Sequence, residues 1–184
     1  VNIETIGIIE GVNDYDDVDT GRERGAYKSV KKVFLPGEFE KRYFTQSHHI
    51  NSLHVCGIQR LDTLLKKRDD QLSSRLRSNK ILVNVNFSYG VLADKRDKWI
   101  SDILEACENV NIDPKLSFHP QDFSKPKYTS KCNISTQGLL DDLSNSKIFI
   151  TRFSGALFEA ILSGCHVIYY NPGIERIDKF NQPL

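Results

Sequence analysis

The chain has 184 residues, of which 39% are hydrophobic and 27% charged, and its formal net charge is +1. This balance is typical of a globular protein and excludes an intrinsically disordered one. The near-neutral charge argues against nucleic-acid binding, which needs a clustered excess of Lys and Arg.

The sequence contains no apolar run near the roughly 18 residues that span a membrane, and no signal peptide opens it. Four cysteines lie far apart without a C-x-x-C pair, which disfavours a disulfide framework or a zinc site. The cysteine pattern predicts a cytoplasmic protein without a zinc site. We also expect no cofactor. Methionine is absent even at position 1, so we expect the natural protein to begin before this chain.

The first half of the chain predicts short strands separated by loops and helices. Thr5–Ile9 is a continuous apolar run rich in β-branched residues, as expected of a strand buried on both faces. The other elements predicted here are the strands Lys32–Leu35 and Leu53–Cys56 and the helices Glu38–Thr45 and Leu61–Lys67. The polar stretch 68–79 predicts a linker, so residues 1–67 and 80–184 are expected to belong to two domains.

The second half alternates strands and helices more regularly. The predicted strands are Lys80–Val85, Lys115–Phe118, Lys147–Thr151 and His166–Tyr170. The predicted helices are Asp97–Val110, a short helix capped by Thr136, and Gly155–Ser163 capped by Ser154. Such alternation predicts an α/β, Rossmann-like parallel sheet with helices on both faces.

Ligands of open parallel sheets bind at the carboxyl ends of the strands. Glu10, Asn84, Asn86 and His119 stand at or just after the ends of predicted strands. Glu10 is a candidate general base, and His119, followed by Pro120, is a candidate hydrogen-bond donor to phosphate. The alternative is that these are ordinary loop residues. We expect Asp141 and Asp142 to form a solvated helix face rather than a metal site.

The turn from Thr151 to Ala156 is the most informative of these strand ends. Ser154 offers a hydroxyl and Gly155 a backbone N–H at the start of a helix, an arrangement that suits phosphate, and Arg152 can add a bidentate contact. Glu159, more than one turn further on, can accept hydrogen bonds from the two hydroxyls of a ribose. The alternative is that Ser154 is only an N-cap and Glu159 a solvated residue. The apolar neighbours of Glu159 weaken that alternative, because an unpaired carboxylate there would be costly.

Absent motifs narrow the classes of enzyme. The sequence has no G-x-G-x-x-G, no G-x-x-x-x-G-K-[ST], no G-x-S-x-G and no H-E-x-x-H. The sequence therefore gives no support to four classes of enzyme: dehydrogenases, P-loop kinases, serine hydrolases and zinc proteases.

The segment from Leu139 to Tyr170 resembles the C-terminal domain of GT-B-fold transferases: a helix ending in a small polar residue, a strand, a Ser-containing turn, an acidic helix, Gly and a further strand. Within that group it resembles capsule and cell-wall enzymes, namely CDP-glycerol glycerophosphotransferases, bacterial sialyl- and Kdo-transferases, and the related UDP-GlcNAc 2-epimerases. Phe118-His119-Pro120 resembles the His-Pro motif of the sialyltransferases, and residues 55–62 resemble the segment that closes the N-terminal domain in the glycerophosphotransferases and epimerases.

The resemblance implies that residues 1–67 are the end of an acceptor-side domain and that 80–184 are an incomplete donor-binding domain. It implies a metal-independent glycosyl- or glycerophosphotransferase that uses a CMP- or CDP-linked donor and a glycan or lipid-linked acceptor in surface polysaccharide synthesis. His119, Ser154 and Gly155 would hold the donor phosphate, Glu159 the ribose, and Glu10 would deprotonate the acceptor. Such an enzyme works in the cytoplasm, at the inner face of the membrane through parts outside this chain. The alternatives are an isomerase resembling UDP-GlcNAc 2-epimerase and a non-catalytic nucleotide-sugar-binding module.

Overall fold

The computed structural model describes residues 4–9, 30–38, 41, 52–59, 61–62, 64–66, 68, 80–87, 92–130 and 132–173. These residues fall into two compact units, one within residues 1–62 and the other within residues 63–175. Of the predicted linker 68–79, all but residue 68 lies outside the described residues, so the predicted domain boundaries stay a prediction.

The first unit contains a parallel sheet whose strands follow one another in chain order. Its strands are β1 (Ile6–Ile8), β2 (Lys32–Leu35) and β3 (Ser52–Val55). Each strand lies where the apolar runs predict it, within one residue at either end. Ile9, Val33 and Leu35 form the small buried core of this sheet. Of the two predicted helices, Glu38–Thr45 lies mostly outside the described residues, whereas residues 61–62 and 64–66 are helical.

The prediction that the first strand is buried on both faces is wrong. Gly7 is buried, but Ile6 and Ile8 are 55% and 66% exposed. Among the described residues, β1 is the edge strand of its sheet and pairs with β2 alone. A continuous apolar run therefore did not indicate a central strand here, because burial of the second face depends on a covering layer that the run itself does not encode.

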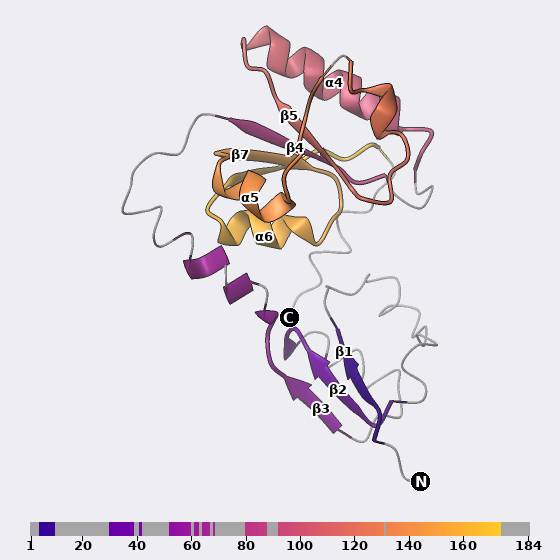
Figure 1. Ribbon diagram of the computed structural model, residues 1–184, viewed down its shortest axis with the longest axis vertical. Coiled ribbons are helices and arrows are strands. Elements are labelled where there is room, and N and C mark those ends of the chain that lie inside the picture. Colours follow the sequence, from indigo (N-terminus) through magenta and orange to yellow (C-terminus); the bar gives the residue numbers. More distant parts are fainter. Residues whose placement is uncertain are drawn as a thin grey trace. The chain divides into compact units, whose positions relative to one another are not determined.

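The second unit is a five-stranded parallel sheet with helices on both faces (Figure 1). In chain order its elements are β4 (Ile81–Val85), α4 (Arg96–Asn109), β5 (Lys115–Phe118), the 3₁₀ helix η3 (Lys125–Lys127), β6 (Asn133–Ile134), α5 (Leu139–Ser144), β7 (Ile148–Thr151), α6 (Ala156–Leu162) and β8 (His166–Tyr169). The strand order across the sheet is β6-β5-β4-β7-β8, and every pair is parallel.

The central strand β4 divides the core into two layers. All five of its residues are buried, and successive side chains point to opposite faces of the sheet. Ile81, Val83 and Val85 pack in the cluster that holds Trp99 and the apolar stripe of α4. Leu82 packs in the other cluster, with the apolar residues of α5 and α6. Figure 1 accordingly shows α4 on one face and α5 and α6 on the other. The predicted α/β, Rossmann-like fold class is confirmed.

Two local predictions in this unit are wrong, and two short elements were not predicted. Neither η3 nor β6 was predicted, because elements of three and two residues are too short for a periodic pattern. Thr136 does not cap α5: the helix begins after Gly138, whose carbonyl accepts from the backbone N–H groups of Asp141 and Asp142. Asp142 is not solvated but only 2% exposed, whereas Asp141 is exposed.

Asp142 has hydrogen-bonding partners in three separate segments of the chain. Its carboxylate accepts a hydrogen bond from the Ser135 hydroxyl and one from Lys115 Nζ at 3.3 Å. The Ser146 hydroxyl donates to its backbone carbonyl at 2.8 Å. These contacts offset the cost of removing a charge from water, and they hold β5, the end of β6 and α5 together.

Substitution of Phe149 tests whether the core on the side of α5 and α6 stabilises the fold. It is fully buried on β7, so Phe149→Ala should lower the free energy of unfolding by about 3–5 kcal/mol through lost burial and a cavity. The measurement is urea denaturation followed by fluorescence of Trp99, the single tryptophan of the chain. Ile161→Ala, at a residue that is 53% exposed on α6, is the control and should change stability by no more than about 0.5 kcal/mol. Equal effects of both variants would contradict this core assignment.

Candidate functional site

The strand order places a topological switch point between β4 and β7. From β4 the chain proceeds through α4 to β5 and then β6 on one side, whereas β7 and β8 lie on the other side of β4. The connections that follow β4 and β7 therefore leave in opposite directions, and open α/β sheets bind ligands outside the carboxyl ends of such a strand pair. We call the residues at these two strand ends, Asn84–Phe87 and Thr151–Gly155, the switch-point site.

Side-chain hydrogen bonds join the two halves of the switch-point site. Asn84 and Thr151 are opposite each other in the register of β4 and β7, and Asn84 Nδ2 donates to Thr151 Oγ1 at 3.1 Å. Asn86 Nδ2 donates to the carbonyl of Phe153 at 2.8 Å. The polar residues that the sequence places after two separate strands therefore meet, and they fix one loop against the other.

Arg152 adds a third link between the two halves. Its guanidinium donates to the carbonyl of Asn86 and stacks over the ring of Phe87, 5.0 Å from the ring centroid. The residue is only 5% exposed. Arg152 thus lies at the predicted location, with part of its hydrogen-bonding capacity directed to the protein. Its direct contact with a phosphate stays a prediction.

The turn into α6 has the predicted small residues, and the helix begins one residue later than predicted. Ser154 Oγ accepts from the backbone N–H of Ala156 at 3.2 Å, so the hydroxyl satisfies one of the first N–H groups of the helix. Gly155 is exposed, and a Cβ added to it would meet no atom within 4 Å. The exposed backbone at Gly155 is therefore accessible to a ligand.

Glu159 is buried, with 6% of its surface exposed, on the same helix as the core residues Ala156 and Ala160. The alternative of a solvated helix residue is therefore wrong. A carboxylate in such surroundings requires hydrogen-bonding partners. Its contact with a ribose stays a prediction.

His119 directly follows β5, at the start of the turn that leads to Asp122. Its Nδ1 accepts from the backbone N–H of Gln121 at 3.1 Å, and its carbonyl accepts from the N–H of Asp122 at 2.8 Å. A neutral imidazole whose Nδ1 is an acceptor carries its proton on Nε2. The contact of His119 with a phosphate stays a prediction. The other predicted site residue, Glu10, lies outside the described residues.

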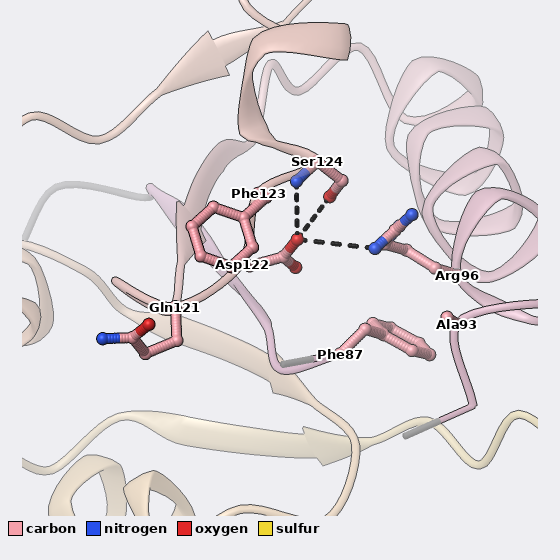
Figure 2. A pocket seen from close by; sticks show the side chains of 7 residues that line it. All are labelled: Phe87, Ala93, Arg96, Gln121, Asp122, Phe123 and Ser124. Atoms are coloured by element: carbon pink, nitrogen blue, oxygen red, sulfur yellow. Dashed lines mark hydrogen bonds and ion pairs between the residues drawn. The ribbon is translucent and has the colours of Figure 1, made fainter. Parts of the chain in front are cut away.

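Sequence reasoning missed a pocket next to His119. It has a volume of about 500 Å³, and its wall consists of Phe87, Ala93, Arg96, Gln121, Asp122, Phe123 and Ser124 (Figure 2). The side chain of Asp122 is 1% exposed, and Arg96 Nη1 lies 3.4 Å from its Oδ1. An Asp two residues after Pro120 was the available signal, but its partner Arg96 lies 26 residues earlier in the chain.

Two hydrogen bonds join the segment around η3 to the first turn of α4. Lys127 and Tyr128 both donate hydrogen bonds to the carboxylate of Asp97. The bond from Lys127, followed by that from Tyr128, lowers the pKa of Asp97. Burial, followed by the hydrogen bond to Asp97, raises the pKa of Tyr128 to about 12. These contacts keep the connection from β5 to β6 in place beside the pocket.

The described residues contain no group of three or more His, Cys, Asp or Glu side chains arranged to hold a metal ion. Within the same part of the chain, no helix is both long enough and apolar enough to cross a membrane.

Thr151→Val tests the link between the two strand ends. Thr151 is fully buried, and valine keeps its shape but leaves Asn84 Nδ2 without its acceptor. We expect the free energy of unfolding to fall by about 1–3 kcal/mol, measured by urea denaturation. Thr136→Val, at an exposed position, should have an effect below about 0.5 kcal/mol. An unchanged stability of Thr151→Val would show that this hydrogen bond does not join the strands in solution.

Tyr128 provides a test at high pH. Because its pKa is raised from 10.0 to about 12, the fold favours the neutral phenol. Its contribution to stability is present below about pH 10 and is lost as the pH rises from about 10 to about 12. The ultraviolet difference titration of wild type against Tyr128→Phe should show a phenol that ionises near pH 12, and the stability difference between the two should shrink over the same interval. A Tyr128 that ionises near pH 10 in the folded protein would contradict the contact with Asp97.

No protein-family model matches the chain, and no curated protein matches it. Among solved structures it is similar to the crystal structure of Methanocaldococcus jannaschii UDP-GlcNAc 2-epimerase in complex with UDP-GlcNAc and UDP. The TM-score is 0.55 and the sequence identity 21%, over 76% of this chain and 45% of that chain. The chain therefore spans less than half the length of the epimerase chain. At this identity the likeness shows the fold, which is GT-B-like and Rossmann-like.

Proposed function

We propose that the second unit binds the nucleotide of an activated donor at the switch-point site, and that the whole protein is a GT-B-type glycosyl- or glycerophosphotransferase. The observation that carries this proposal is the meeting of β4 and β7 at a topological switch point whose loops are fixed by Asn84, Asn86 and Arg152. A parallel sheet of this order places its ligand there. The similar epimerase structure, which contains UDP-GlcNAc and UDP, supports a nucleotide-sugar ligand.

The roles of the residues follow from their chemistry. His119 donates from Nε2 to a donor phosphate, and Ser154 and Gly155 bind the same group from the turn before α6. Arg152 places a positive charge next to that turn, which stabilises the negative charge that develops on the leaving phosphate. Glu159 accepts hydrogen bonds from the ribose. Glu10 is proposed to deprotonate the acceptor hydroxyl, so that no metal is needed.

We propose a CMP- or CDP-linked donor and a glycan or lipid-linked acceptor, used in surface polysaccharide synthesis in the cytoplasm at the inner face of the membrane. This rests on the resemblance of residues 118–120 and 139–170 to capsule and cell-wall transferases. The second candidate is an isomerase of the UDP-GlcNAc 2-epimerase type, which the fold similarity to that enzyme favours. The two candidates differ in the base that they require, cytosine for the transferase and uracil for the isomerase.

Calorimetric titration with CMP, CDP, UMP and UDP tests the proposal. We expect the cytidine nucleotides to bind, and His119→Ala and Ser154→Ala each to weaken that binding about tenfold or more, because each removes a hydrogen bond to a charged phosphate. The matched controls His166→Ala and Ser101→Ala replace exposed residues on β8 and α4 and should leave the affinity unchanged. A preference for uridine nucleotides would favour the isomerase. Absence of nucleotide binding by a folded chain would contradict both.

A further inference from the structure

The register of β4 and β5 places His119 beside the switch-point site. Phe118, the last residue of β5, is opposite Val85, the last residue of β4. His119 and Asn86 are therefore the next residues on two parallel neighbours, and both lie at the carboxyl edge of the sheet, where such sheets bind their ligands. The conformation of the turn that begins at His119 decides where its imidazole lies relative to that edge.

Asp122 closes this turn through its backbone. Its N–H donates to the carbonyl of His119 at 2.8 Å, while the N–H of Gln121, inside the turn, donates to Nδ1 of the His119 ring at 3.1 Å. Both the main chain and the ring of His119 are thus held by the residues that lead to Asp122. The position of His119 consequently depends on where Asp122 is held.

The carboxylate of Asp122 joins the turn to two other elements. Its Oδ1 accepts from the backbone N–H of Ser124 at 2.9 Å and from the Ser124 hydroxyl at 2.6 Å, and Nη1 of Arg96 lies 3.4 Å from the same oxygen (Figure 2). Ser124 directly precedes η3, and Arg96 is the first residue of α4. One oxygen of a side chain that is 1% exposed therefore fixes the His119 turn against both.

Stability alone does not explain this carboxylate. Oδ2 of Asp122 is buried and has no hydrogen-bond partner among the described residues. A buried carboxylate with one oxygen unsatisfied retains much of the cost of leaving water, so its net contribution to stability is small or negative. The role that its contacts support is to select one conformation of the turn.

The rest of the segment is attached to α4 without Asp122. Asp97, the next residue of the helix, accepts hydrogen bonds from Lys127 and Tyr128. The ring of Tyr128 also stacks on that of Phe118, with 5.5 Å between the ring centroids. Removal of the Asp122 carboxylate should therefore release the turn that carries His119 and leave the remainder of the connection in place.

We propose that Asp122 is a positioning residue for His119: its carboxylate fixes the turn after β5 to α4, so that the imidazole is held toward the donor phosphate. This role rests on the proposed function, since it takes His119 as a phosphate ligand. Asp122 acts through His119, without a contact of its own to the donor.

Calorimetric titration of the whole chain with CDP tests this role. Asp122→Ala should weaken CDP binding roughly 5- to 10-fold, the equivalent of about one hydrogen bond, and no more than His119→Ala does. Asp122→Asn keeps an oxygen acceptor for Ser124 and should bind only about two- to threefold more weakly than wild type, because a neutral hydrogen bond is about half as strong as a charged one.

The double variant His119→Ala/Asp122→Ala separates positioning from a general structural role. It should bind CDP as weakly as His119→Ala alone, because without the imidazole nothing remains for Asp122 to position. The matched control is Asp142→Ala, which removes a carboxylate of a residue that is 2% exposed and that contacts Lys115 at the start of β5. This control should lower the free energy of unfolding and leave the affinity for CDP unchanged.

The outcomes separate the positioning role from the function on which it rests. Trp99 is buried, so its fluorescence verifies that each variant is folded, and Asp122→Asn, alone and with His119→Ala, gives the same comparison if Asp122→Ala does not fold. Wild-type affinity of the Asp122 variants, or additive losses in the double variant, would overturn the positioning role and leave the proposed function standing. CDP binding that survives His119→Ala would overturn the phosphate role of His119 and the positioning role with it. A folded wild-type chain that does not bind CDP would overturn the proposed function as well.

Discussion

The complete burial of β4 is the constraint on which the second unit depends. A strand with both faces covered must send alternate side chains into two separate cores. Ile81, Val83 and Val85 enter the core under α4, and Leu82 enters the core under α5 and α6. Two helical layers are needed to cover the strand, and the chain supplies them by crossing over opposite faces on its way to β5 and from β7 to β8. The switch point is a geometric consequence of that arrangement.

The same burial explains why polar side chains gather at one end of the strand. Asn84 is the one polar residue of β4, and its amide is satisfied by Thr151 on the neighbouring strand. Past the strand end, the Asn86 side chain donates to the carbonyl of Phe153, and the Arg152 guanidinium donates to the carbonyl of Asn86. Each of these groups would be costly to bury alone. Together they make a rigid polar platform where a parallel sheet presents its ligand site.

Two buried carboxylates hold the connection between β5 and β7. Asp142 is satisfied by Lys115 and Ser135, and both of its oxygens have partners. Asp122 has its partners on one oxygen only. Both oxygens of Asp142 therefore have hydrogen-bond donors, whereas Oδ2 of Asp122 has none among the described residues.

The sequence by itself determined the longer strands, α4 and the Rossmann-like fold class, because hydrophobic periodicity is a local property that β4 and α4 display within their own residues. It also placed His119, Arg152 and Ser154 at strand ends, since a polar residue after an apolar run is visible without any partner. Only the tertiary structure decided that β1 is an exposed edge strand, that Asp142 and Glu159 are buried, and that Arg96 pairs with Asp122. Those properties depend on layers and side chains brought together from distant parts of the chain, and periodicity carries no information about such partners.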